Sequence, residues 1–465
     1  MKTNFRIRIL IEFLILVSLA GVTLTHAQGN QDSSIPHHIS SLANLPWSTQ
    51  YVQQELYPLQ DVGRYVSMAL RPLDDLPVIS YYDATNGNLM IAYPVLGHSG
   101  NCGSYNNWMC LPLDGDLGDA DVGKYASIDL WGETADSWKL GISYYDATAQ
   151  GLKAIVWTCS YANCNPHIIE IATPVSPSSY HGLSTSIKFN SAGVPTIAYY
   201  SEYTLSSDWL MYAYPVDSGG NCGGGDDAYL WQCDGIDYGD RVGQFASLDI
   251  SWDDIPYIAY YDAGSGDLKY AYHASPSNCG VNNDWICSTI NFEGDVGLYT
   301  SLKAPQSSGD LLRIAYYDKT DGQLKYYDSA WNVVVVDDMS NSLEPMGVSL
   351  TIDNNGYPII AYQQISSEFS PPALQIARPY LAFNDGSFGN CGNIPPGYQH
   401  LYWRCNTLDN GGQYTEEADF ASIVIDSRGL VGIAYSEYDS DLNVMSLKFI
   451  YQHLLRTFMP ITNRH

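Results

Sequence analysis

Positive charge is scarce in this sequence. Its 465 residues include 21 Lys and Arg against 50 Asp and Glu, which gives a formal net charge of −29 at pH 7. Such a chain repels a phosphate backbone, and no cluster of Lys or Arg stands out, so the composition disfavours nucleic-acid binding and docking on an anionic membrane. Cations, neutral glycans and basic protein surfaces stay compatible, and an acid excess is also typical of an extracellular protein that its charge keeps soluble.

Long apolar runs are also missing, except at the start. Residues 9–24 are apolar apart from Glu12, basic residues precede them, and Ala27 is a small residue suited to cleavage. This pattern predicts a secretory signal peptide over residues 1–27, followed by a flexible leader over 28–46. No later stretch is long enough to cross a bilayer, so we expect a secreted mature chain without a membrane span.

Cysteine motifs typical of zinc sites are absent. The 10 Cys form five close pairs, each around a short segment rich in Gly and Asn. A structural zinc site brings together two pairs, typically with CxxC spacing, and the spacings here are longer and variable. We therefore predict local disulfides formed in an oxidising compartment. The pairs are Cys102/Cys110, Cys159/Cys164, Cys222/Cys233, Cys279/Cys287 and Cys391/Cys405.

An internal repeat runs through most of the chain. A typical unit has a Gly-x-aromatic-x-Ser block, a Tyr-Tyr-Asp block, a Gly-x-Leu block and a Trp-x-Cys block. The sixth and seventh units are degraded, with Ala361-Tyr362-Gln363 and Ala434-Tyr435-Ser436 in place of the Tyr-Tyr-Asp. The first and last block serines, Ser67 and Ser422, are six intervals apart, which gives a period of about 59 residues. The serines are Ser67, Ser127, Ser186, Ser247, Ser301, Ser349 and Ser422, and the first tyrosines are Tyr81, Tyr144, Tyr199, Tyr260, Tyr316, Tyr362 and Tyr435.

Seven units of four short strands predict an all-β fold, a seven-bladed β-propeller of four-stranded antiparallel blades over residues 47–455. Tandem β-sandwiches would not explain a single period along the whole chain. The seventh unit reaches a third strand near 446–451 and has no Trp-x-Cys block, whereas Trp47 stands alone before the first unit. We predict that a strand over Trp47–Glu55 completes the last blade and closes the ring. Residues 456–465 form an unassigned C-terminal tail.

This organisation resembles the secreted bacterial β-propeller repeat proteins that are loosely grouped with sialidase-like and lectin-like propellers. The resemblance covers roughly residues 47–455 and rests on the repeat, so it concerns the fold and not the activity. A sialidase-like enzyme would need an arginine cluster, and only Arg64, Arg241 and Arg313 lie near strand starts. The Ser-x-Asp-x-Gly-x-Thr-Trp turn of that family does not occur.

Propeller topology assigns the loops to two faces. The Asp-x-x-x-Gly-x-Leu turns, at Asp83, Asp146, Asp262 and Asp318, should share one face with the acidic segments before each block glycine. The cysteine loops should lie on the opposite face. The acid-rich face is the candidate functional face. Its richest loop holds Asp114, Asp116, Asp119 and Asp121, alternate carboxylates that could bind Ca²⁺ or could belong to a solvated turn.

Charged residues alternate in sign two positions after the serines of units two to five. They are Asp129, Lys188, Asp249 and Lys303, and they should line the central channel. We predict that they pair across neighbouring blades, since an unpaired buried charge is costly; a polar ligand pocket is the alternative. The paired tyrosines should pack between blades, with each hydroxyl finding a partner.

Histidines do not recur in register, and no Ser-His-Asp order or zinc helix motif is present. We therefore expect a non-catalytic extracellular binding module, monomeric, with glycans or extracellular proteins as partners. It requires no cofactor, with Ca²⁺ as the one candidate. The alternative is a secreted glycoside hydrolase or lyase that uses carboxylates at the channel mouth.

Overall fold

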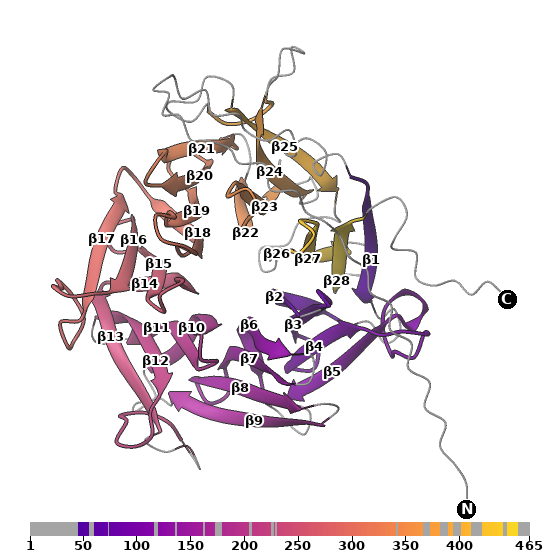
Figure 1. The fold of residues 1–465 in the computed structure, drawn as a ribbon, viewed down its shortest axis with the longest axis horizontal. Coiled ribbons are helices and arrows are strands. Elements are labelled where there is room, and N and C mark those ends of the chain that lie inside the picture. Colours follow the sequence, from indigo (N-terminus) through magenta and orange to yellow (C-terminus); the bar gives the residue numbers. More distant parts are fainter. Residues whose placement is uncertain are drawn as a thin grey trace, which may run out of the picture. The chain divides into compact units, whose positions relative to one another are not determined.

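The computed structural model contains seven four-stranded antiparallel sheets, six built from four successive strands and the seventh from the last three strands and the first. It describes residues 45–54, 60–72, 74–115, 120–134, 137–160, 163–172, 179–203, 207–224, 227, 230–340, 343–365, 373–381, 389–393, 401–410, 421–439 and 444–453. The sheets stand around a common axis as the blades of a propeller (Figure 1). The seven-bladed fold predicted from the repeat is confirmed.

Each blade is named by its order along the chain. Blade 1 holds β2 (Val62–Leu70), β3 (Pro77–Asp83), β4 (Asn88–Pro94) and β5 (Trp108–Asp114), with a short 3-10 turn η1 (Ser104–Asn106) before β5. Blade 2 holds β6 (Val122–Thr134), β7 (Ser137–Asp146), β8 (Gly151–Ser160) and β9 (Asn163–Ala172). Blade 3 holds β10 (Ser179–Phe189), β11 (Pro195–Tyr203), β12 (Asp208–Pro215) and β13 (Trp231–Gly239). Blade 4 holds β14 (Val242–Ile250), β15 (Pro256–Asp262), β16 (Asp267–His273) and β17 (Trp285–Asn291).

The remaining blades follow the same order. Blade 5 holds β18 (Val296–Lys303), β19 (Arg313–Asp318), β20 (Gln323–Asp328) and β21 (Asn332–Asp338). Blade 6 holds β22 (Leu343–Ile352), β23 (Pro358–Ile365), β24 (Ala373–Leu381) and β25 (Leu401–Asp409). Blade 7 holds β26 (Ala421–Ile425), β27 (Val431–Asp439), β28 (Val444–Gln452) and, as its outermost strand, β1 (Trp47–Gln53).

The N-terminal strand closes the ring, as the lone Trp47 predicted. Strand β1 pairs antiparallel with β28, Trp47 opposite Gln452 and Gln50 opposite Phe449. Trp47 packs against the apolar cluster between blades 6 and 7. The strand ends at Gln53, two residues short of the predicted end. The predicted signal peptide and tail lie outside the described residues, as does the leader up to residue 44, and all three stay predictions.

The block serines explain why the repeat holds together. Each serine Oγ accepts a hydrogen bond from a main-chain N–H of the next blade's innermost strand, and the last one, Ser422, accepts from Met68 of blade 1 and completes the circle. The pairs are Ile128–Ser67 (3.1 Å), Ile187–Ser127 (3.2 Å), Leu248–Ser186 (3.0 Å), Leu302–Ser247 (3.0 Å), Leu350–Ser301 (2.9 Å), Ile423–Ser349 (3.1 Å) and Met68–Ser422 (2.9 Å).

The block glycine is required by contact between blades. Gly123 has a φ of +108°, and a Cβ there would lie 2.7 Å from the Cα of Leu89 in the preceding blade. Only glycine combines this left-handed backbone with so close an approach. The apolar core also lies between the blades. Ile91 of blade 1, for example, packs in one cluster with Ile128 and Ile142 of blade 2.

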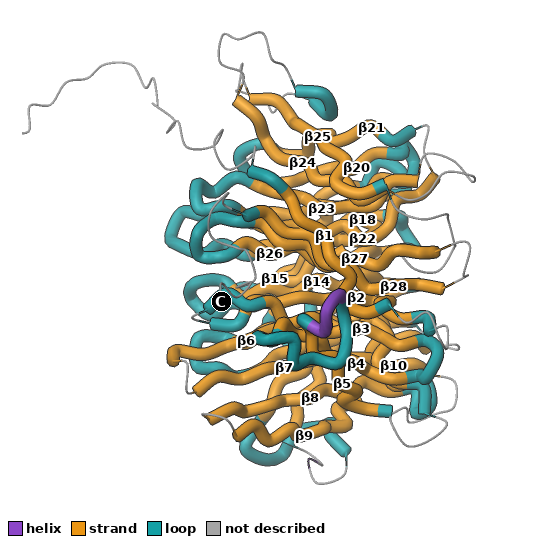
Figure 2. The backbone as a smooth tube through the Cα atoms, turned by 90° about the vertical axis from the view of Figure 1, so that its right-hand side faces the viewer, coloured by secondary structure: helices purple, strands orange, loops and turns teal. Residues whose placement is uncertain are grey.

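The two faces are arranged as predicted. Turns between second and third strands meet the segments before the innermost strands: Lys319 N–H donates to the Asp295 carbonyl at 2.9 Å, and Val296 N–H donates to the Gly266 carbonyl at 2.9 Å. We call this the Asp-turn face, and the opposite one the cysteine-loop face. Figure 2 shows the strands running between loops at both ends. Within the described chain, no helix is long and apolar enough to cross a membrane.

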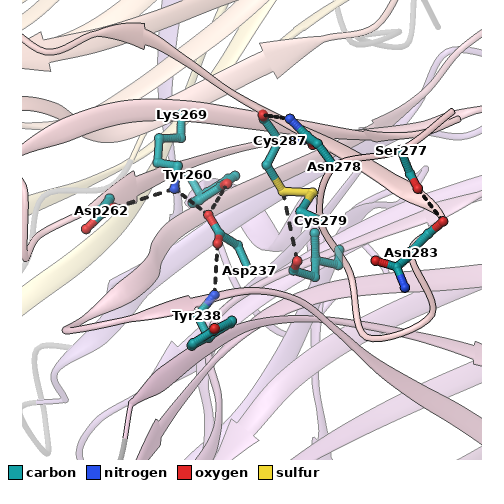
Figure 3. The surroundings of a disulfide bond; sticks show 11 residues. Asp237, Tyr238, Tyr260, Asp262, Lys269, Ser277, Asn278, Cys279, Asn283 and Cys287 are labelled. Carbon is teal, nitrogen blue, oxygen red and sulfur yellow. Dashed lines mark hydrogen bonds and ion pairs between the residues drawn. A yellow bond between two sulfur atoms is a disulfide. The ribbon is translucent and has the colours of Figure 1, made fainter. Parts of the chain in front are cut away.

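Four of the five predicted disulfides are present: Cys102–Cys110, Cys222–Cys233, Cys279–Cys287 and Cys391–Cys405. For the fifth, the strand register sets Cys159 opposite Cys164, but their side chains lie outside what is described. An asparagine before the first Cys supports these loops. In one of them, Asn278 Nδ2 donates to the Cys287 carbonyl (3.0 Å), and its Oδ1 accepts from Cys287 N–H (2.7 Å) (Figure 3).

Candidate functional site

The charged residues predicted for the centre lie on the innermost strands of blades 2 to 5 (Figure 1). Lys188 Nζ lies 3.1 Å from Asp129 Oδ1, and Asp129 Oδ2 accepts from Phe189 N–H at 2.9 Å. Burial acts to lower the pKa of Lys188, but attraction by Asp129 and Asp249 outweighs it and the pKa is raised. Blades 2 and 3 are therefore joined by an ion pair near the axis.

The second predicted pair differs from the first. Asp249 Oδ2 accepts a main-chain hydrogen bond from Ala304 N–H at 2.9 Å, and Lys303 makes no ion pair within 4.0 Å to any residue that the structure describes. Burial, reinforced by the charge of Lys188, lowers the pKa of Lys303. Asp249 thus joins blades 4 and 5 through the backbone rather than through the lysine.

The acidic loop predicted to bind Ca²⁺ is described only at its ends. Asp114 Oδ2 accepts from the Tyr144 hydroxyl at 2.7 Å and lies 3.4 Å from Lys153 Nζ. Asp121 takes a hydrogen bond from the Tyr82 hydroxyl and an ion pair from Lys124. Asp116 and Asp119 lie outside the described residues, so the calcium site stays a prediction. Both described carboxylates already serve contacts between neighbouring blades.

A polar motif recurs between blades. In blade 4, Asp237 comes from the last strand of the preceding blade, and its Oδ2 accepts from the Tyr260 hydroxyl (2.7 Å) and from Lys269 Nζ (2.5 Å) (Figure 3). Lys269 also lies 3.6 Å from Asp262, at the end of the second strand. Burial, and then Asp237, raises the pKa of Tyr260, so its hydroxyl stays protonated and donates. The predicted packing role of the first tyrosines is confirmed here.

The same arrangement recurs in other blades with substitutions. Tyr144, Tyr362 and Tyr435 donate to Asp114, Asp337 and Asp409 of the preceding blades. In three blades another residue replaces the carboxylate of the preceding blade. Tyr316 accepts a hydrogen bond from Asn291, and the Tyr81 hydroxyl donates to Gln53. In blade 3 the preceding blade has Ala172 at the carboxylate position. The lysine recurs as Lys153, Lys325 and Lys448, bound to Asp146, Asp318 and Glu437. Most carboxylates of the blade interfaces are thereby occupied.

Blade 1 keeps the acid of this motif but has no lysine. Asp83 stands at the end of its second strand, and Met90 takes the position of the lysine. A cavity of about 460 Å³ opens there, between blades 7 and 1. Its lining is rich in side-chain amides and carries the carboxylate of Asp83; it consists of Gln53, Gln60, Asp83, Asn86, Asn88, Met90, Asn101, Cys102, Cys110, Pro112 and Gly115. We call it the blade-1 cavity.

Aromatic rings gather on the innermost strands toward the Asp-turn face. Tyr65 and Tyr125, of adjacent blades, have ring centroids 4.7 Å apart, and Phe245 and Tyr299 have theirs 4.6 Å apart. We call these four residues the aromatic collar. Their φ values of +52° to +56° are unusual for bulky residues. They sit where the strand register shifts, and such bulges re-aim side chains.

The collar has a gap and an acidic border. Blade 3 has Ser184 at the equivalent position, with a similar positive φ of +50°, so this blade contributes no ring to the collar at that position. Tyr82 packs beside Tyr65, with centroids 6.1 Å apart, and donates to Asp121 at 2.6 Å. Partly exposed rings with carboxylates behind them suit stacking against sugars or cations.

Arginine and histidine do not form a catalytic cluster in the described residues. Arg64, Arg241 and Arg313 belong to three regions of the ring and pair with nearby Asp61, Asp240 and Asp310. An anion-binding arginine cluster of the sialidase kind is therefore not assembled there. The geometric group Asp337, Cys391 and Cys405 is no thiolate metal site either, because its cysteines form a disulfide.

Comparisons with known proteins identify no family for this chain. No protein-family model matches the sequence, and neither does any curated protein. Among solved structures the chain is similar to AofleA from Arthrobotrys oligospora, at 11% identity and a TM-score of 0.40 over 87% of this chain and 86% of that one.

Two further solved structures show the same level of likeness. The WD40 domain of SCAP from fission yeast matches at 9% identity and a TM-score of 0.35, over 88% of this chain and 87% of that one. The polysaccharide lyase Uly1 matches at 9% identity and a TM-score of 0.28, over 84% and 78%. No match supports the bacterial or sialidase-like part of the predicted resemblance. The residues of this chain must carry the functional argument.

The collar and the blade-1 cavity were both missed in the sequence. The aromatic residue two positions before most block serines was visible in the sequence, but its left-handed backbone was not. The cavity did leave a signal: Met90 stands where four other units have lysine, while Asp83 obeys the repeat.

Proposed function

We propose that the protein is a secreted, non-catalytic binding module that recognises neutral glycans on its Asp-turn face. The observation that carries the proposal is the aromatic collar, in which the ring of Tyr65 packs at a tilt against that of Tyr125, and the ring of Phe245 against that of Tyr299. Half-buried aromatic rings offer apolar faces to the C–H groups of a sugar. Nearby carboxylates can accept hydrogen bonds from sugar hydroxyls.

Three further features support this proposal. A net charge of −29 repels sulfated, sialylated and other anionic glycans, which leaves neutral ones. Left-handed backbone at bulky residues costs about 1–3 kcal/mol each, and such strain tends to cluster at ligand-binding positions. The four disulfides suit an extracellular compartment.

The test is a glycan array followed by isothermal titration with the best neutral oligosaccharide. Tyr125→Ala should weaken binding about tenfold, on the order of 1.4 kcal/mol. Tyr257→Ala is the matched control, because Tyr257 is also half-buried and stacked, on Tyr272 at 5.2 Å, but starts its strand at the cysteine-loop face.

Two results would count against the proposal. Equal losses in the Tyr125 and Tyr257 variants would mean that the collar is only structural. The protein would be an enzyme rather than a binding module if it released chromophore from a panel of chromogenic glycosides and a carboxylate substitution abolished that release.

A further inference from the structure

The distribution of acid and lysine over the blades has one exception. Blades 2, 4, 5 and 7 have a carboxylate at the end of the second strand and a lysine on the third: Asp146 with Lys153, Asp262 with Lys269, Asp318 with Lys325, and Glu437 with Lys448. Blades 3 and 6 have neither, with Ser201 and Met211, and with Gln364 and Gln375. Blade 1 alone retains the acid, Asp83, and has Met90 instead of lysine.

The cavity occupies the place where the other blades have the lysine. Three lining residues occupy the positions of the motif. Gln53 stands at the position of the preceding blade's acid, Asp83 is the acid at the end of the second strand, and Met90 stands at the position of the lysine. The volume of about 460 Å³ is within the range of small-ligand pockets, roughly 300–1,000 Å³. The other blades thus provide an internal template for what binds here.

The acceptors of that template are retained. In blades 4 and 7 a single carboxylate oxygen, of Asp237 or Asp409, accepts both a tyrosine hydroxyl and a lysine ammonium. In blade 1 the corresponding oxygen is Gln53 Oε1, which accepts from the Tyr81 hydroxyl. A carbonyl oxygen has two lone pairs, so Oε1 can accept a second hydrogen bond.

Two buried side chains have hydrogen-bonding capacity left over. Gln53 is only 4% exposed, and its Nε2 has no partner among the residues described. Asp83 is 3% exposed; its Oδ1 accepts from the amides of Thr85 and Asn86, and its Oδ2 accepts only a neutral donor, Asn86 Nδ2 at 2.7 Å. A buried carboxylate without a cationic partner is costly, and a ligand cation would remove that cost.

We propose that the blade-1 cavity binds a primary alkylammonium group, which takes the place of the missing lysine between Gln53 Oε1 and Asp83 Oδ2. Met90 and Pro112 would cover the alkyl stem, as apolar surface covers lysine stems elsewhere. The strongly negative chain attracts such cations. The group can come from a lysine side chain of a partner protein or from a free small amine, and the chemistry of recognition is shared.

The first experiment titrates the intact secreted protein with pentylamine, with 1-pentanol as the uncharged control, and with Nα-acetyl-lysine methylamide as the peptide source. The amine should raise the melting temperature in a saturable manner, and pentanol should not. Tighter binding of the lysine derivative than of pentylamine would indicate a protein partner, and the reverse a free amine. No shift with either amine would overturn the proposal, as would an equal shift with 1-pentanol.

The second experiment supplies the lysine from the chain itself. Met90→Lys should raise the melting temperature and abolish the amine effect, because its own ammonium would then fill the site. Met211→Lys is the matched control: blade 3 has Ser201 and Ala172 at the two acceptor positions, so its buried ammonium should lower the melting temperature.

The remaining outcomes are equally decisive. Asp83→Asn should weaken amine binding at least tenfold, while leaving glycan binding by the collar unchanged. If Met90→Lys destabilises the fold as much as Met211→Lys does, the cavity lacks the acceptors that the template implies and the proposal is wrong. Loss of glycan binding in the Tyr125→Ala protein would not affect any of these results.

Discussion

The interface motif of blade 4 allows a stability prediction from geometry. Lys269 Nζ lies 2.5 Å from Asp237 and 3.6 Å from Asp262, and the three side chains are only 17%, 16% and 14% exposed. Removing one partner of a pair this buried costs about 3–5 kcal/mol, because the other charges stay buried without compensation. We expect Lys269→Met to lose about 3 kcal/mol of unfolding free energy at pH 7.

Thermal denaturation followed by circular dichroism measures this loss. With an unfolding entropy of about 2.1 cal/mol/K per residue and some 400 folded residues, about 3 kcal/mol corresponds to roughly 3–4 °C in Tm. Lys124→Met is the matched control, since the Lys124–Asp121 pair is 29% and 39% exposed and such pairs contribute under about 1 kcal/mol.

Two further variants sharpen the test. Adding Asp262→Ser to Lys269→Met reproduces the Ser201 and Met211 combination of blade 3 and should recover part of the loss. Without the lysine, facing carboxylates raise each other's pKa, so the deficit should shrink as the pH falls toward about 4. A loss in Lys269→Met no larger than in Lys124→Met would refute the reasoning.

Three other predictions concern the scaffold. Ser422→Ala removes the acceptor of the Met68 N–H at the ring closure and should cost about 1–3 kcal/mol in thermal denaturation; an unchanged Tm would contradict the role of the serine circle. Burial raises the pKa of Tyr145 to about 12, so its protonated form contributes stability that is complete below pH ~10 and lost as the pH rises through about 12. The part of the tyrosinate absorbance that Tyr145→Phe removes should therefore rise together with unfolding, and not before it. Replacing Cys279 and Cys287 by serine, which opens a loop of separation 8, should cost about 2–3 kcal/mol in the same assay.

Much of the fold could be read from the sequence because the repeat is dictated by contacts that every blade makes. A serine that must meet the next blade's N–H, and a glycine that must approach a neighbouring leucine, recur wherever those contacts recur. The strand that closes the ring was predicted from one residue, Trp47, which stands before the first repeat unit and belongs to none. The four described disulfides followed from spacing, and an asparagine before each first cysteine marked them as well.

The sites were harder because they depend on which blade faces which. The sequence predicted alternating charges at the axis, but not that Asp249 would bond the Ala304 amide rather than Lys303. The collar depends on left-handed backbone at bulky residues such as Tyr65, which sequence pattern does not predict. The cavity depends on the pairing of β1 with β28 of blade 7, which sets Gln53 beside blade 1.

Departures from the repeat differ in how much they reduce the stability of the fold. This difference separates the departures that are close to neutral from the one that indicates a ligand. When blade 3 loses both the acid and the lysine, it faces Ala172, so the interface loses a pair and keeps no charge of the motif, which is close to neutral for a buried ion pair. Blade 6 also lacks its own acid and the lysine, and there Asp337 of the preceding blade remains and accepts from the Tyr362 hydroxyl. When blade 1 loses only the lysine, Asp83 stays buried and Gln53 Oε1 keeps an unused lone pair. An unbalanced loss of this kind destabilises the empty protein, and it is the kind of change that a bound cation reverses.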